Sequence, residues 1–160
     1  MQRNLIEFYI NQNVKFDSNK LITLNAKELA DIIDACTNTE DLFTYDQRLS
    51  LLCSAIEGGS NYWYYLPDNT TDIVEQYMKN GTYVDGMMRA LMDERTLDIY
   101  DIEDEISCLG SISLQSIREG EKIMRADYPA YFAEVLTDQA DANTGDVWFQ
   151  LSIFKKLIYG

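Results

Sequence analysis

The sequence of 160 residues contains no histidine. This absence excludes Ser-His-Asp and Cys-His catalysis, and it excludes metal sites built on imidazole. A glycine-rich phosphate loop of the GxxxxGK type is also missing. A metal-dependent nucleotide hydrolase that uses carboxylates is the remaining enzymatic alternative, and no motif supports it. We therefore expect a protein that is not an enzyme and carries no cofactor.

Cysteine, proline and long apolar runs are also scarce. The three cysteines, Cys36, Cys53 and Cys108, are far apart and lack CxxC spacing, which favours buried free thiols in a reducing cytosol over zinc or disulfides. There are two prolines and no low-complexity run. No segment approaches the roughly 20 apolar residues that span a bilayer, and the N-terminus lacks a signal-peptide pattern. We expect one cytoplasmic domain over residues 1–160, with no membrane partner.

Basic residues are few: 13 Lys and Arg stand against 27 Asp and Glu, for a net charge of −14. Such a field repels phosphate, which argues against direct binding of nucleic acid. It suits a basic partner, or mimicry of nucleic acid. The acids are densest between residues 85 and 105 and form a candidate acidic face of Asp98, Asp101, Glu103, Asp104 and Glu105. A solvated surface explains this run more simply than a metal site does.

Apolar periodicity and capping patterns predict most helices. Asn25 with Glu28, and Thr44 with Gln47, have capping-box spacing. Helices are expected over 25–37, 44–57, 71–79, 84–92, 113–125 and 129–138. Gly58 is predicted to end the second of these in the left-handed conformation.

Short strands are predicted between and after these helices. Segments 61–66 and 97–102 have strand-like patterns, and Val147, Phe149, Leu151 and Ile153 alternate with other side chains over 147–154. Lys155-Lys156 then precedes 157–159, as a hairpin turn would. The expected fold is α+β: a single domain of about five helices packed on a small antiparallel sheet that includes a C-terminal β-hairpin. The apolar face of 147–154 should be buried against helices 25–36 and 44–57.

The segment Gly58-Gly-Ser-Asn-Tyr-Trp-Tyr-Tyr65 has two compatible interpretations. As structure, alternate rings of a strand point into the core. As a site, glycine amides could meet an anion and a ring could stack on a base. The candidate ligand-binding residues are Gly58, Gly59, Asn61, Tyr62 and Trp63, together with the locally basic Arg118, Lys122 and Arg125.

Two stretches resemble a group of small, acidic proteins of tailed bacteriophages and prophages. The first is Ala55-Ile-Glu-Gly-Gly-Ser-Asn-Tyr-Trp63, similar to an "A-L-E-G-G-I-x-Y-W" segment. The second is residues 144–160, TGDVWFQLSIFKKLIYG, similar to a closing "D-V-x-x-Q-x-x-x-F-G-E-I-V-Y-G" hairpin. Lys155-Lys156 here replaces the Gly-Glu of that pattern. The resemblance implies a phage origin, and small accessory phage proteins often counter host defence; it implies no chemistry.

Two binding functions follow as hypotheses. The first is sequestration, without catalysis, of a small nucleotide-like immune signal in the host cytoplasm. The alternative is an acidic inhibitor that mimics DNA or covers the basic surface of a host defence protein. The first is supported by the Gly-Gly-aromatic segment and the basic residues, and the second by the acid run. Homo-oligomerisation is compatible with either.

Overall fold

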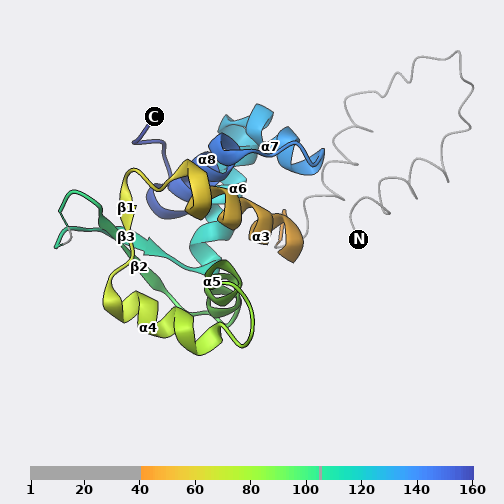
Figure 1. The fold of residues 1–160 in the computed structure, drawn as a ribbon. Helices are drawn as coiled ribbons and strands as arrows, with labels where there is room; N and C mark the ends of the chain where they lie inside the picture. The colour runs from red at the N-terminus through yellow and green to blue at the C-terminus, as the bar shows by residue number, and fades with distance from the viewer. Residues whose placement is uncertain (1–40, 105) are drawn as a thin grey trace, which may run out of the picture. The chain divides into compact units, whose positions relative to one another are not determined.

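The computed structural model describes residues 41–104 and 106–160. Residues 41–160 form a compact unit of their own, and the described part of it is α+β, as predicted (Figure 1). The predicted helix at 25–37 lies outside the described residues, and one domain over the whole chain stays a prediction.

The elements in order are α3 (Tyr45–Ser54), the π-helix η1 (Ala55–Gly59), β1 (Tyr64–Tyr65), α4 (Asp68–Tyr77), α5 (Tyr83–Met92), β2 (Leu97–Asp101), β3 (Cys108–Ile112), α6 (Leu114–Asp127), α7 (Pro129–Leu136) and α8 (Ala142–Phe154).

Side-chain caps fix where several helices begin. Thr44 accepts a hydrogen bond from the backbone of Gln47, whose side chain returns to the Thr44 backbone, so the predicted capping box is confirmed. Ser113 caps α6 in the same way. Pro129 stands in the first turn of α7, where its missing N–H costs no hydrogen bond. Local chemistry therefore accounts for the starts of α3, α6 and α7.

The sheet has the order β1-β2-β3 and is antiparallel throughout. Its shortest strand, β1, pairs Tyr65 with Tyr100. Beyond β1, the Thr70 hydroxyl bonds both the N–H and the carbonyl of Asp98, at 3.2 and 3.1 Å. β1 is too short to pair with Asp98. Thr70, in the first turn of α4, supplies the hydrogen bonds to the Asp98 backbone instead. The predicted strand over 61–66 is shorter than expected, and the one over 97–102 is confirmed.

The predicted C-terminal β-hairpin is wrong, because residues 142–154 form the helix α8. Phe149 is fully buried, as expected, but so are Trp148 and Ser152 on the other sides of the helix. A helix buried on all sides has no polar face, so its sequence shows no 3.6-residue period. Lys155 then ends α8 in the left-handed conformation, with φ of 62°.

A buried ion pair joins α3 to α6. The guanidinium of Arg48 donates to both carboxylate oxygens of Glu121 at 2.7 Å, and both side chains are almost wholly buried. Arg48 also bonds Asp41, which is shared with Arg118. Two parallel hydrogen bonds between buried side chains fix the position of α3 against α6.

A candidate protein-binding surface

Trp63, the centre of the aromatic segment, belongs to the core. Its side chain is 2% exposed, and its ring stacks on Tyr159 with the centroids 4.9 Å apart. The indole N–H donates to a carboxylate oxygen of Asp146 at 2.8 Å, and the Ser60 hydroxyl donates to the same oxygen at 2.7 Å. The Trp63 ring face is therefore occupied by the protein itself.

Two glycines allow this segment to approach α8. A Cβ on Gly59 would overlap the carbonyl oxygen of Ala142, and a Cβ on Gly145 would lie 2.7 Å from the Ala55 nitrogen. Gly58 has ordinary space around it, with Ala142 3.6 Å from its would-be Cβ. Its predicted role as a left-handed helix stop is wrong, because it lies within η1 and the turn closes at Ser60 in the right-handed region.

The C-terminal tail is fastened to the same place by Gln150. Its amide oxygen accepts from the backbone N–H of Ile158 at 2.8 Å and of Tyr159 at 2.9 Å. Its amide nitrogen donates to Asp146 at 2.8 Å and to the Tyr159 carbonyl at 3.0 Å. One side chain thus connects the tail to the carboxylate that holds Trp63.

The other predicted ligand residues lie in two separate places. Gly58 and Asn61 are exposed and Tyr62 is 52% exposed, beside the first turns of α8. Arg118, Lys122 and Arg125 belong to α6, where Arg118 pairs with Asp41 at 2.8 Å and Lys122 is exposed.

Helix α8 stands between these two groups. Its Asp146 and Gln150, one turn apart, face the aromatic segment. Ser152 and Leu151 instead meet Gly120 of α6, at 2.7–2.8 Å from its would-be Cβ. Residues 150 and 152 differ in direction by about 200° around a helix, so α6 packs on the opposite side of α8. The structure therefore does not bring the basic residues and the aromatic segment together in one pocket.

Exposed apolar side chains lie on the segments next to Trp63. Ile102 follows β2, and its backbone N–H donates to the Trp63 carbonyl at 3.3 Å. Ile158 precedes the Tyr159 ring that stacks on Trp63, and Ile106 lies in the loop between β2 and β3. Four exposed apolar or aromatic side chains thus belong to neighbouring segments, and we call them the tip patch: Tyr62 at 52%, Ile102 at 42%, Ile106 at 87% and Ile158 at 51% exposed.

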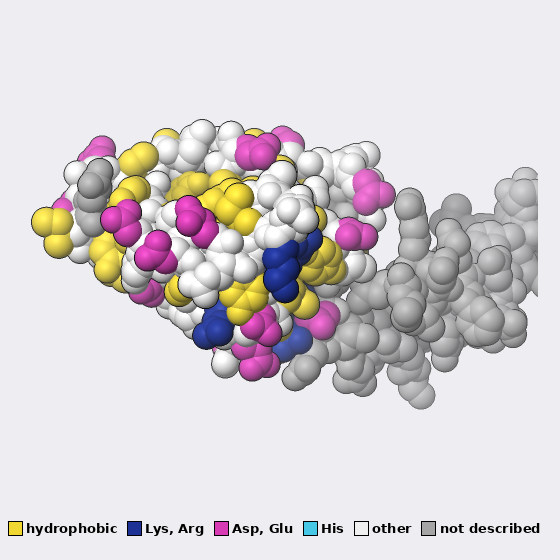
Figure 2. All heavy atoms as spheres, turned by 60° about the horizontal axis from the view of Figure 1, so that its bottom comes forward, with side chains coloured by type: hydrophobic (Ala, Val, Ile, Leu, Met, Phe, Trp, Pro, Cys, Tyr) yellow, Lys and Arg dark blue, Asp and Glu magenta, His cyan; other side chains and the backbone are white. Residues whose placement is uncertain are grey.

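Carboxylates border the tip patch. Asp101 accepts from the Glu103 N–H at 2.8 Å, and Asp104 accepts from the Ser107 hydroxyl at 2.8 Å. These turns order the hairpin loop from within. Asp101, Glu103 and Asp104 are the acidic rim, and Figure 2 shows acidic and hydrophobic side chains side by side at this end of the molecule. The side chain of Glu105 lies outside the described residues, and Asp98 points to the other face of β2.

Electrostatics link the rim to the tail. Burial raises the pKa of Tyr159, and the negative charges of Asp101 and Glu103 raise it further. Burial and the neighbouring Asp146 charge likewise raise the pKa of Tyr62. Both phenols therefore stay protonated at neutral pH, and the Tyr62 hydroxyl donates to Asp146 at 3.4 Å.

Sequence reasoning missed the apolar half of this surface. Ile102 and Ile106 are single apolar residues within an acidic run, and only their place on a hairpin loop shows that they are exposed. Among residues 41–104 and 106–160, no group of three or more metal-binding side chains converges, and no helix has the length and apolar character needed to cross a bilayer. No family model, curated protein or solved structure is detectably similar to this chain.

Proposed function

We propose that this protein binds another protein through the tip patch, and that the partner presents a basic surface with apolar residues. The observation that carries the proposal is that four hydrophobic side chains are exposed on the segments around the buried Trp63 and on the adjoining hairpin loop, which also carries three carboxylates. An apolar centre with a polar rim is typical of protein interfaces.

Charge decides which kind of protein would bind. A second copy of this chain would bring another acidic rim and another net charge of −14 to the interface. Like charges brought together across an interface cost several kcal/mol. A basic partner gains attraction from the same field, and its approach is accelerated. The exposed isoleucines favour a protein surface with apolar contacts over pure imitation of DNA.

The phage resemblance gives the proposal a setting. An accessory phage protein in the host cytoplasm would act as an inhibitor by covering a basic functional surface of a defence protein. Mimicry of DNA is one form of this action, because a defence protein that binds DNA must expose such a surface.

Paired variants test the proposal. The set Asp101→Asn, Glu103→Gln and Asp104→Asn removes three charges and keeps side-chain oxygens for the turns; Glu75→Gln, Glu94→Gln and Asp127→Asn form the control. A host protein captured by the wild-type chain would be purified and titrated against each by calorimetry. The rim set should weaken binding at least about tenfold, and the loss should be largest below about 0.15 M salt, where charges are less screened. The control set should weaken binding much less.

The apolar half of the patch is tested separately. Ile102→Ser with Ile106→Ser should weaken the same complex about a hundredfold or more, as loss of central interface residues does. Leu136→Ser, also at an exposed apolar position but on α7, is the matched control. Equal loss from both, or no loss from the isoleucine variant, would reject the tip patch as the binding surface.

Capture of a nucleotide-like signal is the second candidate, favoured by one observation. Tyr62 is half exposed beside Gly58, where a ring could stack on a base. Buried Trp63 and the distant Arg118 weigh against it. Cyclic dinucleotides and ADP-ribose-type compounds would be screened by thermal shift. A thermal shift that Tyr62→Ala abolishes would support nucleotide binding at this site. Recovery of a chemically modified compound would indicate catalysis.

A further inference from the structure

The outer face of the sheet carries a second group of side chains suited to binding. Leu97 and Ile99 of β2 are fully buried, so Asp98 and Tyr100 point to the opposite face. Tyr65 of β1 is the direct cross-strand partner of Tyr100, and Cys108 of β3 is its partner on the other side. Tyr65, Asp98 and Tyr100, which we call the outer triad, thus lie on one half-exposed face of adjacent strands.

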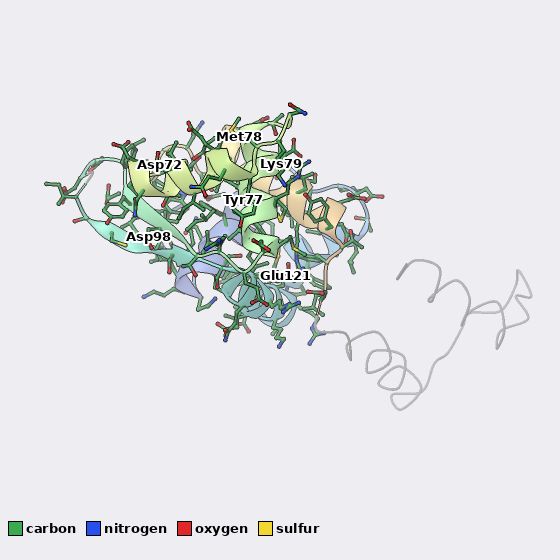
Figure 3. All side chains as sticks on the ribbon, turned by 90° about the horizontal axis from the view of Figure 1, so that it is seen from below. Asp72, Tyr77, Met78, Lys79, Asp98 and Glu121 are labelled. Atoms are coloured by element: carbon green, nitrogen blue, oxygen red, sulfur yellow. The ribbon has the colours of Figure 1, made fainter. Side chains whose placement is uncertain are left out.

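The backbone beneath the outer triad is fixed. Antiparallel pairing holds the Cβ atoms of Tyr65 and Tyr100 about 5 Å apart. The Thr70 hydroxyl bonds both backbone groups of Asp98, which anchors the carboxylate-bearing residue to α4. Figure 3 shows Asp98 on β2 and Asp72 on the neighbouring α4.

The chemistry of the outer triad selects a cation. The face of a phenol ring attracts a positive charge, and an adjacent carboxylate adds an ionic contact. A guanidinium suits the site better than an ammonium, because its plane can stack on a ring while its N–H groups reach a carboxylate. Phosphate-bearing ligands are repelled by the acids around it.

We propose that the outer triad receives an arginine side chain of the protein partner. The inference rests on the proposed function, since the partner's basic surface supplies the arginine. The hairpin connects the two places: Tyr100 on the outer face is followed directly by Asp101 of the acidic rim. A partner on the tip patch can therefore extend along β2 onto the outer triad.

A direct test uses N-acetyl-arginine amide as the probe and amide NMR spectra of the full chain as the readout. Saturable shifts should appear at residues 65, 98 and 100. The citrulline analogue, which has the same shape without the charge, should cause none there. The lysine analogue should bind more weakly. Equal effects of arginine and citrulline, or arginine shifts that do not favour these positions over other surface acids, would overturn the proposal.

Variants separate a site from a general acidic effect. Tyr100→Phe keeps a ring and should retain binding within about twofold, whereas Tyr100→Thr, a good strand former, should weaken it about two- to fivefold. Asp98→Asn should weaken binding of the arginine amide by a similar factor, while Asp72→Asn on α4 should not. A Tyr100→Thr protein that binds as the wild type does would overturn the proposal.

The same experiment distinguishes this inference from the proposed function. Ile102→Ser with Ile106→Ser leaves the outer triad intact, so the arginine amide should bind this variant as it binds the wild type. If the isoleucine variant keeps the partner while Tyr100→Thr loses the probe, the tip patch fails and the outer triad stands. If the isoleucine variant loses the partner and no probe binds, only the arginine inference fails.

Discussion

The indole nitrogen of Trp63 lies 2.8 Å from a carboxylate oxygen of Asp146, although the two residues are 83 positions apart in the sequence. This hydrogen bond joins two stretches that are far apart in the sequence, residues 55–63 and 144–160. Gly59 and Gly145 permit the contact by letting the backbones meet. These two stretches of the chain therefore form one packing unit; Ile158 of the tip patch lies within it, and Ile102 lies on a segment that contacts it.

Removing the carboxylate should destabilise the fold strongly. Asp146→Ala leaves the donors of Ser60 and Trp63 without an acceptor and removes one of the two acceptors of Gln150, and each buried unsatisfied group costs about 1–3 kcal/mol. We expect a loss of at least about 3 kcal/mol in the free energy of unfolding, measured with urea. The exposed cap variant Asp141→Ala should lose only about 1 kcal/mol. Similar losses in both would contradict the buried network.

The two neighbouring glycines should respond in opposite ways to alanine. Gly59→Ala forces a methyl group into the Ala142 carbonyl and should cost about 3 kcal/mol. Gly58→Ala has space for its methyl group and should be neutral or stabilise the helical turn by up to about 1 kcal/mol. Thermal and urea unfolding of the pair checks this, and the reverse order would show that the segment packs differently.

Alanine substitutions at two glutamates of α6 should have very different effects on the free energy of unfolding. Glu121→Ala leaves the Arg48 charge buried with half of its partners and should cost about 3–5 kcal/mol. Glu119 meets Lys155 at the surface, so Glu119→Ala should leave the unfolding free energy nearly unchanged. A tolerated Glu121→Ala would mean that α3 and α6 are not joined as described.

Acid should weaken the start of α8. The backbone N–H of Thr144, the Thr144 hydroxyl and the Asn143 N–H hold the pKa of Asp141 below its ordinary value of 3.8. Folding lowers this pKa, so the charge stabilises the native state above pH 3.8, and the effect is lost as pH falls through the folded value. Asp141→Asn keeps the cap without the charge. Its stability deficit against wild type should be largest near pH 7 and shrink below pH 3.8; a deficit independent of pH would contradict the assignment.

The sequence predicted what local chemistry determines. Thr44 with Gln47 marked the start of α3, and the alternation of Leu97 and Ile99 marked β2. The helix α8 could not be found this way. It is surrounded by protein, so Trp148, Gln150 and Ser152 are as buried as Phe149, and the apolar pattern looked like a strand. β-branched and aromatic residues lower helix propensity, so the residues of α8 themselves did not indicate a helix. The local signal for a helix was Asp141, which caps its first turn.

Part of the candidate site could be predicted from the sequence, and part depended on packing between distant segments. The acids of the rim are plain in the sequence, and so is the aromatic segment. Whether a ring is a binding face or core depends on what packs against it, and Tyr159, almost a hundred residues away, covers Trp63. The strand β3 was missed because Gly110 interrupts it, and without β3 the loop that displays Ile106 cannot be recognised.

Crosslinking at single positions tests the central claim most directly. A photoreactive benzoylphenylalanine would replace Ile106, and in a second protein Leu136, and each chain would be irradiated inside bacterial cells. Because Ile106 is 87% exposed at the hairpin tip, its replacement should leave the fold intact. We predict a discrete adduct with one basic protein from position 106, lost when the acidic rim is neutralised, and none from position 136. The same adducts from both positions, or none from position 106, would contradict binding through the tip patch.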